Sequence, residues 1–197
     1  MFADALRVAT AASRKEGIAI NTSNLGRVLS RLHRHDEALA LFEIARGMFE
    51  EMGDGGEVLE TEARVAECYV FMGNWGEALA RSDAAFRLAR ELGGVPPQMP
   101  LLHRARAYAL MQAGRAPESR EPLEASLAAA RARQADFDIG LTLRALAEFA
   151  RVAGEPPDPD VEQESKTILD RLGGQQGPDR SPISCLPMDP RRSAKAT

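Results

Sequence analysis

Apolar residues recur along this chain at helical spacing. One such run is Ala38, Leu41, Phe42, Ala45, Met48, Phe49 and Met52. Intervals of three and four residues place these side chains on one face of a helix. Glycine follows at position 53, where it can adopt the left-handed conformation that ends a helix. The pattern therefore predicts an amphipathic helix that packs against a neighbour.

The same pattern returns three times farther along the chain. Leu25-Gly26 corresponds to Val65-Ala66, Ala107 and Leu146-Ala147, at intervals of 40 or 41 residues. A turn marked by Gly73, Gly114 or Gly154 separates two predicted helices in each later copy. A fixed period of this length is typical of stacked structural units. We therefore expect an all-α fold, an α-solenoid of antiparallel helix pairs with about four units of roughly 40 residues.

These positions resemble the tetratricopeptide repeat (TPR) family. The matching residues are Asn24-Leu25-Gly26, Ala38, Phe42 and Ala45, then Ala66, Tyr69, Gly73, Ala78 and Ala85, then the segment 107–127. The resemblance covers roughly residues 2–172, although the period exceeds the usual 34 residues of the family. It implies stacked helix pairs whose first helices line a concave groove. Departures are Ser82, Ser119 and Ser126 at apolar or alanine positions, and Pro122, which should kink or loosen its helix.

The repeats define the expected domain organisation. We predict one repeat domain over 1–173, composed of a half-repeat helix 1–17 and the units 18–57, 58–98, 99–137 and 138–173, and a disordered tail over 174–197. Gly17 should end the half-repeat helix as Gly53 ends the next one. A half-repeat indicates either a fragment of a longer protein, which we favour, or an N-terminal cap, and it leaves self-association through this end open. At the other end, Asp158 should cap a last helix from about Pro159 to Leu172 with a polar outer side.

Composition narrows the function classes. The formal net charge of −4 disfavours a dedicated nucleic-acid binder, which usually has a strong basic excess. No apolar run approaches the length of about 18 residues that a membrane span needs. The two cysteines, Cys68 and Cys185, are far apart and indicate a reducing cytoplasm rather than a disulfide framework. We therefore expect a cytoplasmic protein that binds neither nucleic acid nor membrane.

Catalytic and cofactor motifs are not found in the sequence. The segment 53–57 lacks the Lys-Ser/Thr of a phosphate-binding loop, and no zinc-protease or nucleophile-elbow motif occurs. His33 and His35 flank an expected turn, and His103 is two repeats away, so three or four metal ligands are not available. Asp36 and Glu37 fit the first turn of a helix through its dipole. We predict no enzyme activity, no cofactor and no metal site.

The predicted groove supplies the candidate site. Outward positions of the first helices are Arg27, Arg31, Glu67, Phe71, Arg104, Tyr108, Met111, Arg144, Glu148 and Arg151. Arginines interleaved with aromatic and apolar side chains suit an acidic or mixed peptide. We therefore expect a non-catalytic scaffold that binds a protein or peptide partner in this groove. Trp75, at a turn, is expected to pack between two helices rather than to contact a partner.

A second hypothesis places the chain within a larger protein. The Ala/Arg-rich segments 58–80 and 100–133 resemble in sequence the C-terminal TPR regions of bacterial signalling proteins. Class III adenylate/guanylate cyclases and large ATP-binding regulators of actinobacteria carry such regions. The resemblance implies a regulatory C-terminal fragment of a signalling enzyme or transcriptional regulator.

Overall fold

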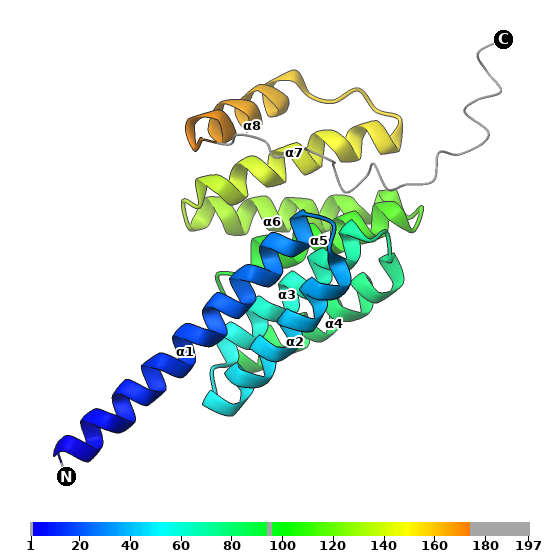
Figure 1. The fold of residues 1–197 in the computed structure, drawn as a ribbon. Coiled ribbons are helices and arrows are strands. Elements are labelled where there is room, and N and C mark those ends of the chain that lie inside the picture. The colour runs from blue at the N-terminus through cyan, green and yellow to red at the C-terminus, as the bar shows by residue number, and fades with distance from the viewer. Residues whose placement is uncertain (1, 94–95, 174–197) are drawn as a thin grey trace.

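The computed structural model describes residues 2–93 and 96–173, with side-chain detail from Ser13 onward, and its regular elements are all helices. They are α1 (Phe2–Arg31), α2 (His35–Met52), α3 (Gly55–Phe71), α4 (Trp75–Leu92), α5 (Met99–Gln112), the 3₁₀ helix η1 (Ala116–Ser119), α6 (Arg120–Ala132), α7 (Asp136–Ala153) and α8 (Pro159–Arg171). The fold is all-α in this part of the chain, as predicted (Figure 1). The tail predicted over 174–197 lies outside the described residues.

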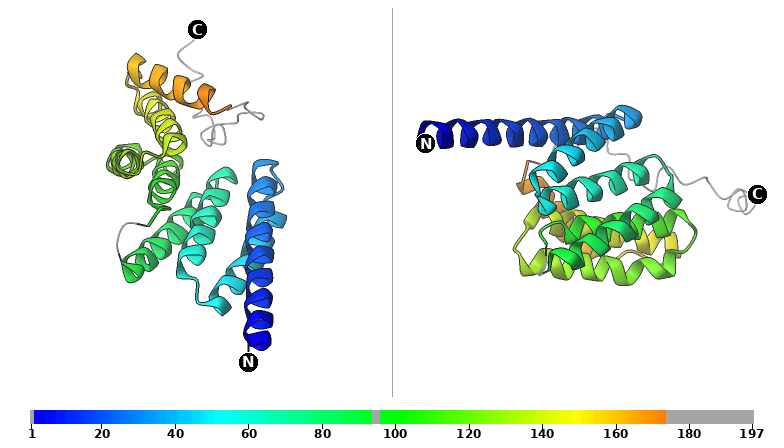
Figure 2. Two further views of the ribbon diagram at one scale, coloured as in Figure 1. Left: turned by 90° about the vertical axis from the view of Figure 1, so that its left-hand side faces the viewer. Right: turned by 90° about the horizontal axis from the view of Figure 1, so that it is seen from below.

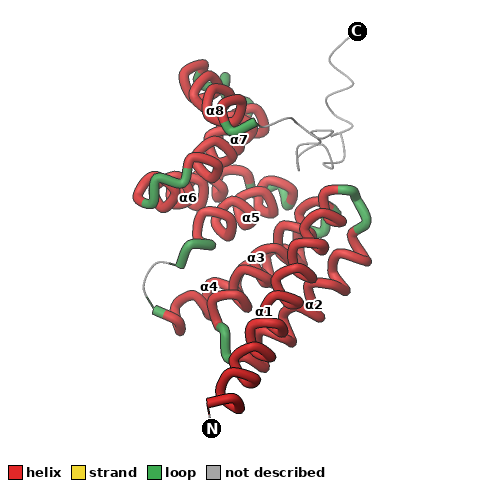
Figure 3. Tube along the Cα trace, turned by 60° about the vertical axis from the view of Figure 1, so that its left-hand side comes forward, coloured by secondary structure: helices red, strands yellow, loops and turns green. Residues whose placement is uncertain are grey.

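The helices pack in chain order as a row of hairpins. The pairs α1–α2, α3–α4, α5–α6 and α7–α8 are in contact, and each hairpin also contacts the next (Figure 3). The odd-numbered helices contact one another as well, α1 with α3, α3 with α5 and α5 with α7. One side of the row is therefore built from four odd-numbered helices that lie next to one another, which we call the odd-helix face.

The predicted helix end at Gly17 is wrong. α1 is a single helix from Phe2 to Arg31, and its first half extends beyond the hairpins (Figure 2). A Cβ built at Gly17 would have no neighbour within 4 Å, so no packing contact forces glycine at this position. Glycine inside a helix costs only about 1 kcal/mol relative to alanine, which the continuous hydrogen-bond ladder tolerates. The half-repeat 1–17 and the first helix of the next unit are one element.

A single turn geometry recurs between the helices. At positions 33, 53, 73, 114, 134 and 154 the residue has a positive φ, and its N–H donates to the carbonyl three residues earlier. The following N–H donates to the carbonyl five residues earlier, as in Arg34 to Leu29 and Asn74 to Tyr69. This pair of bonds is the Schellman motif, which satisfies carbonyls left open at a helix end. Four of the six positions are glycine, but His33 and Gln134 adopt the same geometry without it.

Replacing His33 by glycine should stabilise the protein. His33 has a φ of 60°, a conformation that costs most side chains about 1–2 kcal/mol. Glycine also gains entropy in the unfolded chain, which offsets part of this benefit. We expect His33→Gly to raise the free energy of unfolding by about 0.5–1 kcal/mol in urea denaturation. A lower value for His33→Gly than for the wild type would show that the imidazole has a structural role.

Hydrogen bonds between helices explain two of the three departures from the apolar pattern, Ser119 and Ser126, whereas Ser82 Oγ donates to the Ala78 carbonyl of its own helix. Ser119 Oγ donates to the Ala107 carbonyl at 3.0 Å, and Ser126 Oγ to the Pro100 carbonyl at 2.8 Å. Ser165 of α8 donates in the same way to the Gly140 carbonyl at 2.8 Å. Each of these three hydroxyls therefore joins the second half of a hairpin, α6 with the preceding η1 or α8, to the backbone of the first helix. A buried hydroxyl with a hydrogen-bond partner avoids the cost of an unpaired polar group.

Pro122 does not lie in the middle of one long helix, as the prediction of a kinked or loosened helix assumed. α6 begins only at Arg120, after the 3₁₀ turn η1, so Pro122 lies in the first turn of α6. The N–H groups of a first turn have no acceptor within the helix. Proline, which has no N–H, therefore breaks no helical hydrogen bond at this position. The capping prediction at the next hairpin is confirmed, because Asp158 Oδ1 accepts from the Asp160 N–H at 2.9 Å.

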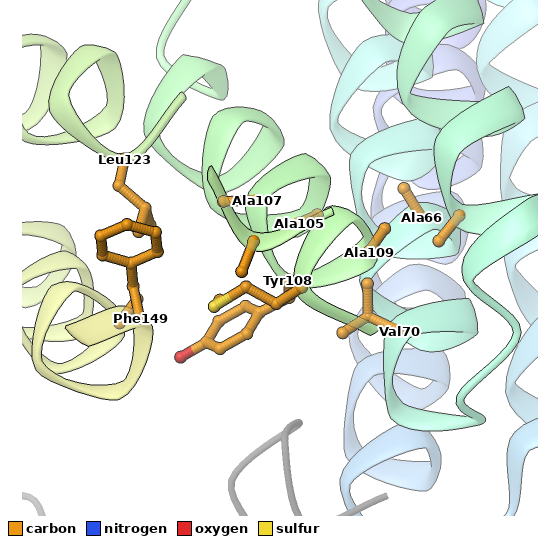
Figure 4. Packing of buried hydrophobic residues seen from close by; sticks show 12 residues of the cluster. Ala66, Val70, Ala105, Ala107, Tyr108, Ala109, Leu123 and Phe149 are labelled. Carbon is orange, nitrogen blue, oxygen red and sulfur yellow. The ribbon is translucent and has the colours of Figure 1, made fainter. Parts of the chain in front are cut away.

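The core continues from hairpin to hairpin. Its largest cluster joins α3 to α7, with Val70 and Ala66 on one side of Tyr108 and Leu123 and Phe149 on the other (Figure 4). Alanine predominates on α5, which allows α3 and α7 to approach it closely. Neighbouring hairpins therefore share buried side chains rather than forming separate cores.

Candidate functional site: the odd-helix face

The structure places the ten predicted groove residues on the four odd-numbered helices, but at different depths. Arg27, Arg31 and Arg151 are exposed, and Glu67, Phe71, Arg144 and Glu148 are partly exposed. Arg104, Tyr108 and Met111 are buried, with exposed fractions of 5%, 5% and 1%. The prediction that these three side chains project into an open groove is therefore wrong.

Glu67 lies at the meeting point of α1, α3 and α5. Its carboxylate accepts a hydrogen bond from Arg64 Nη1 at 3.2 Å, and Arg31 and Arg104 lie close enough to act on it electrostatically. Burial alone would raise the pKa of Glu67, but the charges of Arg64, Arg31 and Arg104 outweigh it and hold the pKa below its usual value. Arg64 is also bonded to Glu60, by Nε at 2.9 Å. The carboxylates of Glu60 and Glu67 therefore both accept hydrogen bonds from Arg64.

Arg104 joins α5 to α7 from inside the packing. Its Nη1 donates to Asp138 Oδ1 at 3.2 Å and approaches Thr142 Oγ1 at 3.4 Å. The side chain of Arg104 is 6% exposed and that of Asp138 is 29% exposed. A guanidinium removed from water needs such partners, because an unpaired buried charge is very costly. Arg104 therefore contributes to packing rather than to an open surface.

Tyr108 makes a second connection between α5 and α7. Its Oη donates to Glu148 Oε2 at 2.7 Å. Burial, reinforced by the Glu148 carboxylate, raises the pKa of Tyr108 well above its usual value. The phenol therefore stays protonated and remains a hydrogen-bond donor at neutral pH. Met111, one turn farther along α5, belongs to the core with Leu123 and Phe149.

Part of the predicted site lines a hollow between α7 and α8. A cavity of about 280 Å³ is lined by Arg144, Glu148 and Arg151 from α7 and by Glu162, Lys166 and Asp170 from α8. Arg151 forms an ion pair with Glu162, and Lys166 forms one with Asp170. Both signs of charge line this cavity, so three predicted groove residues are brought together with partners from α8.

A second cavity was not predicted from the sequence. It has a volume of about 390 Å³ and is lined by Asp83, Phe86, Arg87, Arg90, His103, Arg106, Glu121 and Pro122, from α4, α5 and α6. Arg106 forms an ion pair with Asp83. The His103 ring lies 4.9 Å from the Phe86 ring, measured between centroids. No motif marks these residues, because they come from three helices and only the packing brings them together.

His33 and His35 lie near each other at the turn before α2, with ring centroids 5.6 Å apart. His33 is exposed at the turn, and His35 opens α2 with its Nδ1 3.7 Å from Cys68 Sγ. Within the described residues, no three His, Cys, Asp or Glu side chains gather closely enough to hold a metal ion. Burial, assisted by the neighbouring His33, lowers the pKa of His35, although Asp36 acts in the opposite direction.

The partly buried histidines predict that the free energy of unfolding falls in mild acid. Burial lowers the pKa of His103; Glu121 opposes this shift and Arg106 adds to it. The unfolded chain, with an ordinary histidine pKa of about 6.5, then binds protons at pH values where the folded chain does not. We expect the free energy of unfolding to be lower at pH 5.5 than at pH 7.5, and the decrease to be smaller in His103→Gln. Equal pH dependence in both proteins would exclude His103 as a cause.

Comparison with known proteins does not assign the chain to a family. No protein-family model matches it, and no curated protein sequence is significantly similar to it. None of the helices in the described parts of the chain is long and apolar enough to cross a bilayer.

Trp75 is less buried than its predicted position between two helices implies. It is the first residue of α4, and 47% of its surface is exposed. The indole is therefore only partly packed between the helices of its hairpin. Nothing else in the structure indicates a partner at this position.

Proposed function

We propose that this chain is a TPR-like α-solenoid that acts as a protein-interaction module without catalysis of its own. The recurrence of one turn geometry and the contacts between successive odd-numbered helices support this arrangement. In such arrays the repeated helices provide an extended concave surface for a partner. A fold alone does not determine function, so the choice of partner depends on the side chains of the odd-helix face.

The distribution of charge on this face carries the proposal. Arg27 and Arg31 are exposed on α1, and Arg151 is exposed on α7. Among the described residues Arg27 has no ion-pair partner, whereas the carboxylates of Glu67 and Glu148 already receive hydrogen bonds. Since Tyr108 is buried, Phe71 is the aromatic side chain among the ten predicted groove residues that a partner can reach in part. The face therefore suits an extended acidic segment with one apolar side chain.

A peptide-display selection on the purified full chain tests this function. We expect peptides rich in Asp and Glu with a single aromatic or aliphatic residue to be enriched, because arginines predominate among the accessible charges. Binding should weaken as salt rises from 50 to 500 mM, since exposed charges are screened. Enrichment of basic peptides, or no enrichment over an unrelated helical protein, would contradict the proposal.

A second candidate function is a regulatory C-terminal region of a larger bacterial signalling enzyme or transcriptional regulator. The Ala/Arg-rich sequence of segments 58–80 and 100–133 supports this function. The coding sequence upstream of Met1 tests it directly. An in-frame catalytic domain would support this function, and a stop codon immediately upstream would contradict it.

A further inference from the structure

The cavity between α4, α5 and α6 combines three kinds of side chain. It lies where the α3–α4 hairpin meets the α5–α6 hairpin, and its volume is about 390 Å³. Its lining includes the guanidinium groups of α4, the rings of Phe86 and His103, and the carboxylate of Glu121. The volume is in the range of small-molecule sites, about 300–1,000 Å³. We call this hollow the α4–α6 cavity.

Arg87 and Arg90 bring two positive charges to the cavity that the protein does not neutralise. They are three residues apart on α4, a spacing that places their Cβ atoms about 5–6 Å from each other. Asp83, one turn before Arg87, forms its ion pair with Arg106 of α5 instead. Neither Arg87 nor Arg90 forms an ion pair with a residue that the structure describes, and this includes the neighbouring Glu91. Two like charges this close on a helix repel each other, and a bound anion would remove that cost.

An aromatic surface adjoins these arginines. Phe86 precedes Arg87 on α4, and its ring centroid is 4.9 Å from that of His103 on α5. The guanidinium carbon of Arg106 lies 5.8 Å from the centroid of the Phe86 ring. Burial lowers the pKa of His103, although Glu121 acts in the opposite direction, so the imidazole is uncharged at neutral pH. Both rings are only partly buried, and another planar ring can therefore stack on them.

Glu121 adds a hydrogen-bond acceptor to the lining. It is exposed in the first turn of α6 and makes no hydrogen bond or ion pair within the described part of the chain. Its charge acts on His103, which shows that the carboxylate lies near the rings. A ligand with N–H or O–H groups beside its own ring can donate to this carboxylate, whereas a ligand that carries only acceptors would be repelled.

From these three features we propose that the α4–α6 cavity binds a mononucleotide, with its phosphate held by Arg87 and Arg90 and its base on the Phe86 ring. A phosphate monoester carries a charge of about −1.5 to −2 at pH 7, which matches two guanidinium groups, whereas a carboxylate matches one. The ribose hydroxyls and the amino group of the base supply donors for Glu121. Because both arginines are exposed to water, the dissociation constant should be on the order of 100 μM.

This site is separate from the odd-helix face. The cavity uses His103 and Arg106 of α5, whereas the odd-helix face contains Arg104, Tyr108 and Met111 of the same helix. The inference therefore does not depend on the peptide proposed for the odd-helix face. A chain that loses the nucleotide but keeps an acidic peptide, or the reverse, distinguishes the failure of one proposal from the failure of the other.

Isothermal titration calorimetry of the full chain with adenosine 5′-monophosphate (AMP) tests the proposal. The expected result is one AMP per chain. Adenosine, which lacks the phosphate, and ribose 5-phosphate, which lacks the base, should each bind about tenfold or more weakly. No binding of AMP at about 1 mM, or equal affinity for AMP and ribose 5-phosphate, would overturn the proposal. Tighter binding of salicylate, an aromatic carboxylate, than of AMP would overturn the choice of a phosphate.

Two variants separate the phosphate contact from the ring contact. Arg87→Gln/Arg90→Gln should weaken AMP binding about tenfold or more, to the level of adenosine. Phe86→Leu removes only the stacking, so it should weaken AMP binding about threefold or more and leave ribose 5-phosphate binding unchanged. An equal loss of both ligands in Phe86→Leu would overturn the placement of the base. Circular dichroism checks that each variant keeps the helical fold.

Arg131→Gln/Arg133→Gln is the matched control for the phosphate contact. It removes the same two charges at exposed positions beyond the other end of the cavity-lining helix α6. Its affinity for AMP should stay within about twofold of wild type, because exposed charges that far away are screened. Equal weakening by both double variants would show that AMP responds only to the total charge of the chain, and would overturn the site.

Discussion

Arg104→Glu is expected to lower the free energy of unfolding by about 3–5 kcal/mol. The buried guanidinium of Arg104 is bonded to Asp138 and approaches Thr142. Glutamate at this position would place a second carboxylate beside Asp138, in a place where water does not screen their repulsion. Since domains of this kind are usually stable by only about 5–15 kcal/mol, the loss should be easy to detect.

Urea denaturation followed by circular dichroism measures this effect. Arg27→Glu is the matched control, because it makes the same change on an exposed part of α1 and should alter stability by less than about 0.5 kcal/mol. Arg104→Met keeps most of the side-chain volume and introduces no carboxylate. Its free energy of unfolding should therefore fall by only about 1–3 kcal/mol, the effect of leaving Asp138 without its hydrogen-bond donor. If Arg104→Glu were as stable as Arg27→Glu, the position of Arg104 inside the α5–α7 contact would be wrong.

Gly26→Ala should also destabilise the protein, by about 1–3 kcal/mol. A Cβ at this position would lie 2.9 Å from Phe42 Cε1 and 3.2 Å from the Ala38 carbonyl oxygen. Phe42 is 1% exposed and the Ala38 oxygen belongs to the backbone, so neither can move away cheaply. The two helices of the first hairpin would have to separate, and the core around Phe42 would lose contacts.

Gly47→Ala is the control for the helix propensity of alanine. Gly47 lies inside α2, and a Cβ there would have no neighbour within 4 Å. The free energy of unfolding of this variant should be about 0.5–1 kcal/mol higher than that of the wild type, because alanine favours the helix. Combining Gly26→Ala with Phe42→Leu should recover part of the loss, since it removes the ring atoms nearest the new Cβ. A neutral or stabilising effect of Gly26→Ala alone would contradict the close approach of α1 and α2.

The helix hairpins were predictable because their signals are local. Apolar residues at helical spacing, and glycine at Gly73, Gly114 and Gly154, mark helices and turns that the structure contains. The errors occurred where packing or continuity overrides a local signal. Gly17 resembles Gly53 in the sequence, yet α1 continues through it, whereas the chain reverses at His33 without any glycine. A glycine permits a turn but does not enforce one.

The sequence placed the ten groove residues on the correct helices, but it did not show which of their side chains are buried. Helical spacing places Arg104, Tyr108 and Met111 on one side of α5. It does not show that α7 covers this side and supplies Asp138 and Glu148 as hydrogen-bond partners. These contacts join residues 34 and 40 positions apart, and a single sequence carries no signal of such pairs. Arg27 and Arg31 of α1, by contrast, are exposed as predicted.

The most direct test of the proposed function is the affinity of an enriched acidic peptide for two doubly charge-reversed variants. Arg27→Glu/Arg31→Glu changes the odd-helix face, and Arg87→Glu/Arg90→Glu makes the same change on exposed positions of α4. Fluorescence anisotropy at 100 mM salt should show binding about tenfold or more weaker for the first variant and within about twofold of wild type for the second. Equal weakening in both variants, or a loss confined to Arg87→Glu/Arg90→Glu, would contradict binding at the odd-helix face.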